Sequence, residues 1–89
     1  MLSDIELKKI IYNCELTAFQ RILLLGLYAL ADDKLEVKGT NKKLANLFEK
    51  TDICISMALS ALKKADYLFI SFDNGNVANR KITLLRENI

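Results

Sequence analysis

The chain has 89 residues, of which 13 are basic, 11 are acidic and none is histidine, so its formal net charge is +2. Hydrophobic residues make up 52% and charged residues 27% of the chain, a balance that excludes intrinsic disorder and predicts one domain over residues 1–89. The longest apolar run, residues 22–31, is about half as long as a bilayer-spanning helix, and the N-terminus has no signal-peptide pattern. We therefore expect a cytoplasmic protein that does not enter a membrane.

The first 15 residues are expected to form an N-terminal helix or an extended arm. Ser3 or Asp4 can cap a short helix that ends near Tyr12, because a side-chain oxygen there can accept a hydrogen bond from an unpaired backbone N–H. A strand or an arm fits the same residues almost as well, so the sequence leaves the structure of this segment open.

A longer helix is predicted next. Thr17 and Gln20 form the T-x-x-Q pattern of a capping box, and Leu16 is placed to pack against the first turn. The helix is expected to end at about Ala31. It is apolar nearly all round, and one of its faces consists of Phe19, Ile22, Leu23, Leu27 and Leu30.

The same helix has a second apolar face that needs a cover. Two explanations fit, and the sequence does not choose between them. Either the N-terminal segment packs on this face, or the face is the interface of a homodimer. The candidate dimer-interface residues are Leu24, Leu25 and Tyr28.

Two short amphipathic segments separated by a polar break occupy residues 40–66, after a very short strand predicted at 35–37. The first is expected to be a helix that ends at Glu49, and the second a helix over 52–65 that begins after the N-cap residue Thr51. Apolar residues recur at helical spacing in both, which gives each helix one buried stripe: Leu44, Ala45 and Phe48 in the first, and Ile55, Ala58, Leu59, Leu62 and Ala65 in the second.

A β-hairpin is predicted over residues 67–85, with the Asn-Gly pair at 74–75 as its turn signal. Its register stays open. A two-residue turn would place Ile82 opposite Tyr67, whereas a longer loop would pair Ile82 with Ile70. We favour the longer loop, because it puts more apolar side chains on one face of the hairpin.

No catalytic or metal-binding constellation is found. The chain lacks histidine and a glycine-rich phosphate loop, its acidic residues are scattered, and two isolated cysteines are too few ligands for zinc. We therefore expect no enzymatic activity, no metal and no cofactor. Cys14 and Cys54 each lie among apolar neighbours, which predicts reduced, half-buried thiols, with a disulfide as the weaker alternative.

The order of helix, short strand, two helices and hairpin resembles that of winged helix-turn-helix domains, over about residues 16–85. The phrase ALSALKKADYL, which begins at Ala58, is similar to the end of their second helix, although Asp66 stands where the family usually has glycine. Residues 79–84 are similar to the returning wing strand of plasmid and phage replication proteins from Gram-positive bacteria. The resemblance implies a mainly α fold with a small β-sheet (α+β), three to four helices and a C-terminal wing.

The resemblance also implies a function: binding of double-stranded DNA by a homodimer that acts as a transcriptional regulator or a replication-initiation or accessory factor, with a second replication or regulatory protein as a further partner. The charge distribution favours an anionic partner, because residues 1–33 have three basic and five acidic side chains and the rest has ten and six. The residues expected to contact DNA are Lys38, Lys42, Lys43, Thr51, Ile53, Ser56, Met57, Ser60, Lys64, Arg80 and Lys81.

One departure from the pattern supports a competing hypothesis. Specific DNA readers usually have arginine, asparagine or glutamine near the start of the second helix, and this chain has none there. The outward face of that helix instead includes Ile53 and Met57. A winged-helix module that binds another protein, through the Ile53/Met57 surface or through the surface around Leu24 and Tyr28, is therefore the alternative.

Overall fold

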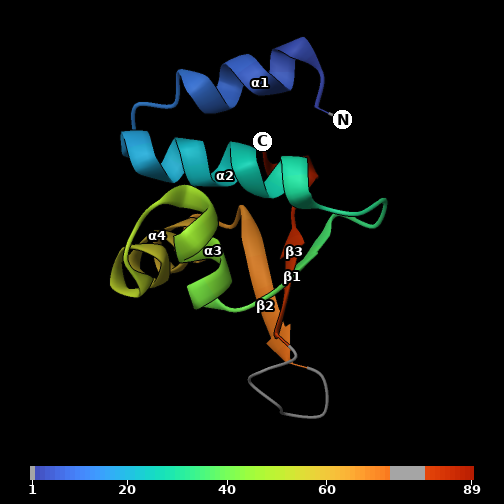
Figure 1. The fold of residues 1–89 in the computed structure, drawn as a ribbon. Coiled ribbons are helices and arrows are strands. Elements are labelled where there is room, and N and C mark those ends of the chain that lie inside the picture. The colour runs from blue at the N-terminus through green and yellow to red at the C-terminus, as the bar shows by residue number, and fades with distance from the viewer. Residues whose placement is uncertain (1, 73–79) are drawn as a thin grey trace.

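The computed structural model describes residues 2–72 and 80–89, and it arranges four α-helices and three strands in an α+β fold within those residues (Figure 1). The predicted α+β fold class with a C-terminal strand pair is confirmed, while the Asn-Gly turn at 74–75 lies outside the described residues. The elements, in chain order, are α1 (Asp4–Ile11), α2 (Ala18–Leu30), β1 (Glu36–Lys38), α3 (Asn41–Phe48), α4 (Asp52–Lys64), β2 (Leu68–Phe72), β3 (Arg80–Leu84) and a short 3-10 helix (Arg86–Asn88).

Each α-helix begins after a serine or threonine whose hydroxyl accepts a hydrogen bond from a backbone N–H three residues later. This local bond satisfies one of the N–H groups that the first turn leaves unpaired. The reciprocal contact of a capping box is present at α1 and α2, where Glu6 and Gln20 bond back to the cap residue. The N-terminal segment is therefore a helix and not an arm. The four cap residues are Ser3, Thr17, Thr40 and Thr51.

The helix α1 lies across one side of α2, while α3, α4 and the sheet lie on the other side (Figure 1). Leu24 is 0% exposed, so it has no surface to offer a second copy of the chain, and its prediction as a dimer-interface residue was wrong. Leu25 and Tyr28 are half-buried and pack against the core. Burial raises the pKa of Tyr28 to about 12, and its hydroxyl has no hydrogen-bond partner among the described residues.

Several other apolar side chains of the first two helices are on the surface. Ile22 and Leu30, which the sequence pattern placed on a buried face, are 55% and 47% exposed.

The two cysteines are exposed and free, so the prediction of half-buried thiols was wrong. Cys14 lies in the turn between α1 and α2, and Cys54 lies in the first turn of α4, next to the exposed Ile53. Apolar neighbours in sequence did not imply burial, because both positions point away from the core.

The three strands form one antiparallel sheet in the order β1-β3-β2. Ile70 of β2 pairs with Ile82 of β3, which confirms the strand register predicted with the longer loop. Val37 of β1 pairs with Ile82 from the other side. Leu68, Ile82 and Leu84 are each no more than 2% exposed. The strand pair thus extends from the core at one end and projects beyond the helices at the other (Figure 1).

Left-handed backbone occurs at three non-glycine residues among those described: Leu35, Glu49 and Asp66. Asp66, with φ 62°, ends α4 where the family usually has glycine, and it adopts the backbone expected for that position. Leu35 follows a turn in which the Asp32 carboxylate accepts hydrogen bonds from the backbone N–H groups of Glu36 and Lys34, and these bonds lower the pKa of Asp32.

An ion pair joins the two ends of the chain. Arg86 donates to both carboxylate oxygens of Glu6, at 2.7 Å and 2.6 Å. The Arg86 bond, with help from the Ser3 backbone N–H, lowers the pKa of Glu6 from 4.5 to about 2. Because a bidentate pair between arginine and a carboxylate fixes relative orientation, this contact holds α1 against the C-terminal 3-10 helix.

The Glu6 pair predicts a loss of stability in acid. The pKa of Glu6 is lower in the folded chain than in the unfolded chain, so the pair stabilises the fold fully above about pH 5, and this contribution is lost as the pH falls from 4.5 toward 2. We expect the difference in free energy of unfolding between the wild type and Glu6→Gln, measured by urea denaturation, to shrink over that range. Arg86→Gln should remove the same acid-dependent component; a difference that is independent of pH would contradict the assignment.

Candidate nucleic-acid interface

The helices α3 and α4 pack together and form the helix-turn-helix. Glu49 adopts a left-handed backbone at the end of α3, and Thr51 caps α4 by accepting a hydrogen bond from the backbone N–H of Cys54. One face of α4 is buried through Ile55, Ala58, Leu59 and Leu62. The opposite face is exposed and bears Ile53, Ser56, Met57, Ser60, Lys63 and Lys64.

Three lysines lie near the start of α3, and all are exposed. Lys42 and Lys43 belong to its first turn, and Lys38 ends β1 just before it. Thr40 uses its hydroxyl to cap this helix, and backbone N–H groups at a helix start favour a negatively charged ligand. This corner of the molecule therefore combines exposed cations with the positive end of a helix dipole.

Lys81 is less accessible to a ligand than the sequence suggested. Its Nζ lies 3.3 Å from a carboxylate oxygen of Glu36 on the neighbouring strand β1, and both side chains are partly buried. The pairing follows from the strand register. Lys81 lies directly opposite Lys38 of β1, and Glu36 stands two residues before Lys38 on that strand. A partly neutralised charge on the sheet attracts a phosphate less strongly than a free lysine does.

The structure corrects the position of Arg80. The sequence placed this residue among the exposed wing cations, but it is 9% exposed. Its Nε donates to the Gly39 carbonyl at 3.0 Å and its Nη1 donates to the Asn41 side-chain oxygen. Burial lowers the pKa of Arg80. Arg80 therefore joins the start of β3 to the start of α3, a contact between segments far apart in the chain that no local pattern encodes.

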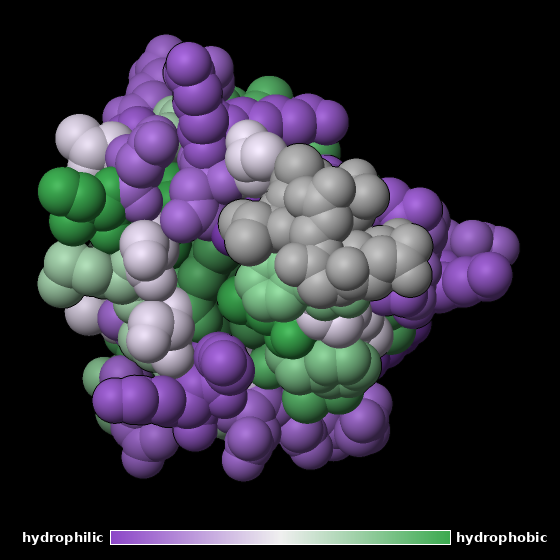
Figure 2. Space-filling model, turned by 90° about the horizontal axis from the view of Figure 1, so that it is seen from below, coloured by the Kyte–Doolittle hydropathy of each residue, from purple (hydrophilic) through white to green (hydrophobic). Residues whose placement is uncertain are grey.

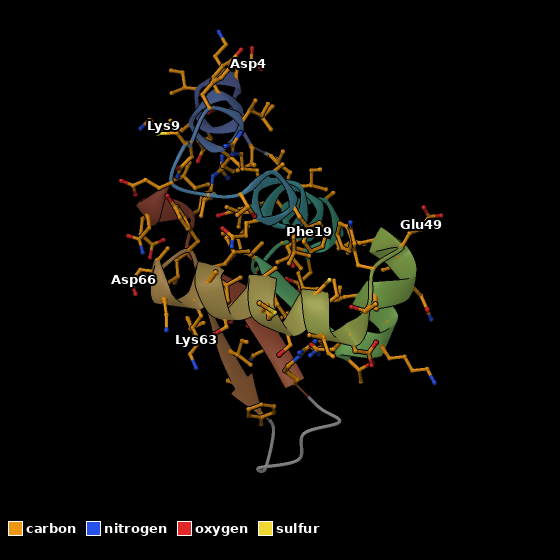
Figure 3. All side chains as sticks on the ribbon, turned by 90° about the vertical axis from the view of Figure 1, so that its left-hand side faces the viewer. Asp4, Lys9, Phe19, Glu49, Lys63 and Asp66 are labelled. Carbon is orange, nitrogen blue, oxygen red and sulfur yellow. The ribbon has the colours of Figure 1, made fainter. Side chains whose placement is uncertain are left out.

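A cleft of about 190 Å³ lies between α4, the start of α3 and the two strands of the wing, β2 and β3. It is lined by Asn41, Ser56, Leu59, Ser60, Lys63, Ile70 and Arg80. Figure 2, which views the molecule from the wing end, shows hydrophilic side chains around a hollow face with apolar groups on its floor. Figure 3 shows Lys63 projecting from α4 toward the side of the wing. No local sequence pattern marks Asn41 as a site residue, because its contact with Arg80 exists only in the folded chain.

A shallower depression on the same helix is lined by Ser56, Met57, Ser60, Ala61 and Lys64. The structure thus brings together four of the predicted contact residues of α4 (Ser56, Met57, Ser60 and Lys64). Ile53 lies in the first turn of α4, away from these two hollows, and Thr51 uses its hydroxyl as the helix cap.

Within residues 2–72 and 80–89, no group of three or more cysteine, aspartate and glutamate side chains is arranged to hold a metal ion. No helix in this part of the chain is long and apolar enough to cross a membrane.

No protein-family model matches the chain, and no curated protein matches it. Solved structures do. The S. aureus MepR–DNA complex has a TM-score of 0.67 and 19% sequence identity, with 93% of this chain and 64% of that chain covered. The chain has the winged-helix fold. A MepR mutant bound to an oligodeoxyribonucleotide has a TM-score of 0.68 and 21% identity, with 90% of this chain and 55% of that chain covered.

The chain therefore spans roughly half to two thirds of the length of the MepR chains that it matches. A third structure, a MepR mutant from a multidrug-resistant S. aureus clinical isolate, has a TM-score of 0.69 and 19% identity over 93% of this chain and 57% of that chain. The winged-helix part of the resemblance seen in the sequence is confirmed. The narrower similarity to replication proteins stays a prediction.

Proposed function

We propose that this chain binds double-stranded DNA as a winged-helix regulator. The observation that carries the proposal is the exposed face of α4, where Ser56, Ser60 and Lys63 line a cleft together with Asn41 at the start of α3. Exposed lysines lie at both of these helices, Lys42 and Lys43 in the first turn of α3 and Lys64 at the end of α4. MepR, whose fold it shares, was solved in a complex with DNA. In this proposal α4 enters the major groove, because a groove about 12 Å wide admits an α-helix.

The lysines supply most of the affinity in this proposal. Lys38, Lys42 and Lys43 contact backbone phosphates on one side of the groove, and Lys63 and Lys64 do so at the far end of α4. Phosphate contacts fix the position of a protein on the duplex and do not discriminate among sequences. Lys81 contributes less, since it is already paired with Glu36.

Sequence discrimination is expected to be modest. Ser56 and Ser60 can donate to either a base or a phosphate, and Ile53 and Met57 can contact thymine methyl groups, but this face has no arginine, asparagine or glutamine for a bidentate hydrogen bond to a base. A homodimer would compensate by binding two half-sites. Regulation of transcription and an accessory role in replication both fit such a dimer, in the cytoplasm and beside a second regulatory or replication protein.

A salt titration tests the proposal. We expect a labelled duplex of mixed sequence to be bound at low salt, with the logarithm of the association constant falling against the logarithm of salt concentration with a slope of roughly −4, since about five lysines release counterions. Fluorescence anisotropy over a series of salt concentrations measures this slope. Failure to bind any duplex at about 50 mM salt would end the proposal.

A second function is favoured by one observation: Ile53 and Met57 are 71% and 69% exposed on the same helix. An apolar groove beside them is lined by Thr17, Phe19, Gln20, Cys54, Met57, Ala58 and Ala61. Exposed isoleucine and methionine are more typical of a protein-binding surface than of a DNA-binding one. The alternative is therefore a module that binds a protein through this surface.

The sign of a charge placed at position 57 separates the two functions. If α4 meets DNA, Met57→Lys should tighten duplex binding and Met57→Glu should weaken it, each by several-fold, because the added charge lies against the phosphates. Both changes keep an exposed helical position and should leave the fold intact, as circular dichroism can check. Equal affinities for the wild type and both variants would show that this face does not meet DNA and is free for a protein.

A further inference from the structure

Among the described residues, the buried guanidinium of Arg80 has no counter-ion. The side chain is 9% exposed, and the described residues place no carboxylate in an ion pair with it. Its two hydrogen bonds go to neutral oxygens, those of Gly39 and Asn41. A buried charge is costly unless an opposite charge compensates it, so this arrangement is incomplete on electrostatic grounds.

The third nitrogen of the same group also lacks a partner in the part of the chain that the structure describes. Nη2 of Arg80 is buried and has no hydrogen-bond partner among the described residues. Unpaired buried donors are rare in proteins, and a donor of this kind is often satisfied by a bound ion or water. Arg80 lines the cleft between α4 and the wing strands, so an ion that entered this cleft would lie next to the guanidinium.

The other polar groups of the cleft suit an oxyanion. Ser56 and Ser60 each present a hydroxyl donor, and Lys63 adds a second positive charge. Glu36, an acidic residue of the adjoining sheet, is already paired with Lys81. The cleft holds about 190 Å³, which is enough for one tetrahedral oxyanion and a few waters.

We propose that this cleft binds a single phosphate-type oxyanion between the Arg80 guanidinium, the Lys63 ammonium and the hydroxyls of Ser56 and Ser60. The oxyanion supplies the missing negative charge and an acceptor for Nη2. The exposed serine and lysine side chains turn to admit it, while Asn41 acts as a positioning residue that holds the guanidinium through Nη1. The oxyanion is either free phosphate or a phosphodiester of DNA; the second source rests on the proposed DNA binding.

Titration with inorganic phosphate at constant ionic strength tests the site, because an arginine Nε–H gives its own NMR signal. We expect the Nε–H signal of Arg80 and the amide signals of Ser56 and Ser60 to shift with one saturable curve. Phosphate should also raise the melting temperature as it binds the folded state. Shifts that are spread over the surface lysines and do not saturate would overturn the proposal.

Variants at exposed positions keep the test independent of folding. Ser60→Ala combined with Lys63→Ala should weaken phosphate binding about tenfold or more, the loss expected for charge-assisted hydrogen bonds. Lys9→Ala removes one charge on α1, at the opposite end of the molecule from Lys63 (Figure 3), and should leave phosphate binding unchanged. Equal phosphate affinities for the double variant and the wild type would contradict the site. Asn41→Ala should weaken binding through the loss of guanidinium orientation.

Competition with a duplex identifies the source of the oxyanion. If phosphate at saturating concentration weakens duplex binding several-fold more than chloride of equal ionic strength, a backbone phosphate occupies the cleft in the DNA complex. If phosphate saturates the cleft and duplex affinity does not change, the site takes a free oxyanion. Duplex binding without a saturable phosphate site would refute this inference and leave the proposed function standing. Saturable phosphate binding without duplex binding would refute only the proposed function.

Discussion

Replacing Lys42 and Lys43 together by alanine is expected to weaken the binding of every duplex sequence by about the same factor, on the order of tenfold or more. Both side chains are exposed in the first turn of α3, and in the proposed complex they contact phosphates and not base edges. Each lost phosphate contact also releases one fewer counterion, so the salt slope should become shallower by roughly two units. Anisotropy titrations with two unrelated duplexes measure both quantities.

The matched control removes the same charge from the other end of the molecule. Lys8 and Lys9 lie on α1, and Figure 3 shows Lys9 on the side opposite to Lys63. Alanine at both positions changes the net charge equally but should leave the slope and affinity nearly unchanged, apart from a small long-range effect. A similar loss in both double variants would mean that net charge, and not the α3 corner, drives binding. Loss for only one duplex sequence would contradict a phosphate role.

Replacing Gly26 by valine is expected to destabilise the fold by about 2–3 kcal/mol, equivalent to a melting temperature lower by roughly 10–20 °C in a domain of this size. Gly26 lies inside α2, directly against the ring of Phe48 at the end of α3, and a β-carbon there would be 2.5 Å from the Cε1 atom of Phe48. The Phe48 ring packs edge-on against Phe19, with centroids 6.4 Å apart, so it cannot move aside without losing that contact. Thermal unfolding followed by circular dichroism measures the shift.

Two comparisons separate the steric effect from helix propensity. Ala29→Val introduces the same side chain at an exposed position of α2 and should cost less than about 1 kcal/mol. In a Phe48→Leu background the ring atoms next to Gly26 are absent, so Gly26→Val should cost at least about 1 kcal/mol less than in the wild type. Equal costs in the two backgrounds would show that Phe48 is not the obstacle. Because Phe48 ends α3, a steric conflict here would also displace the helix that bears Lys42 and Lys43.

The sequence determined the elements whose signals are local. Thr17 with Gln20, and Thr51 before α4, fixed two helix starts, because a cap needs only residues within one turn. Apolar alternation favoured the pairing of Ile70 with Ile82 without excluding the other register, and the structure confirmed it. The exposed surface of α4 followed from the helical spacing of its buried stripe, although Ala65, which was predicted to belong to that stripe, is exposed just after the last turn.

Tertiary structure decided everything that depends on which distant residues meet. Arg80 has the sequence position of a wing cation, yet its contacts with Gly39 and Asn41 bury it, and Lys81 meets Glu36 only because β1 pairs with β3. Leu24 was open to two interpretations until α1 was seen to lie across α2. Local hydrogen bonds and periodicity are encoded within a few residues, whereas burial and charge pairing are properties of the assembled core, so no short pattern in the chain specifies them.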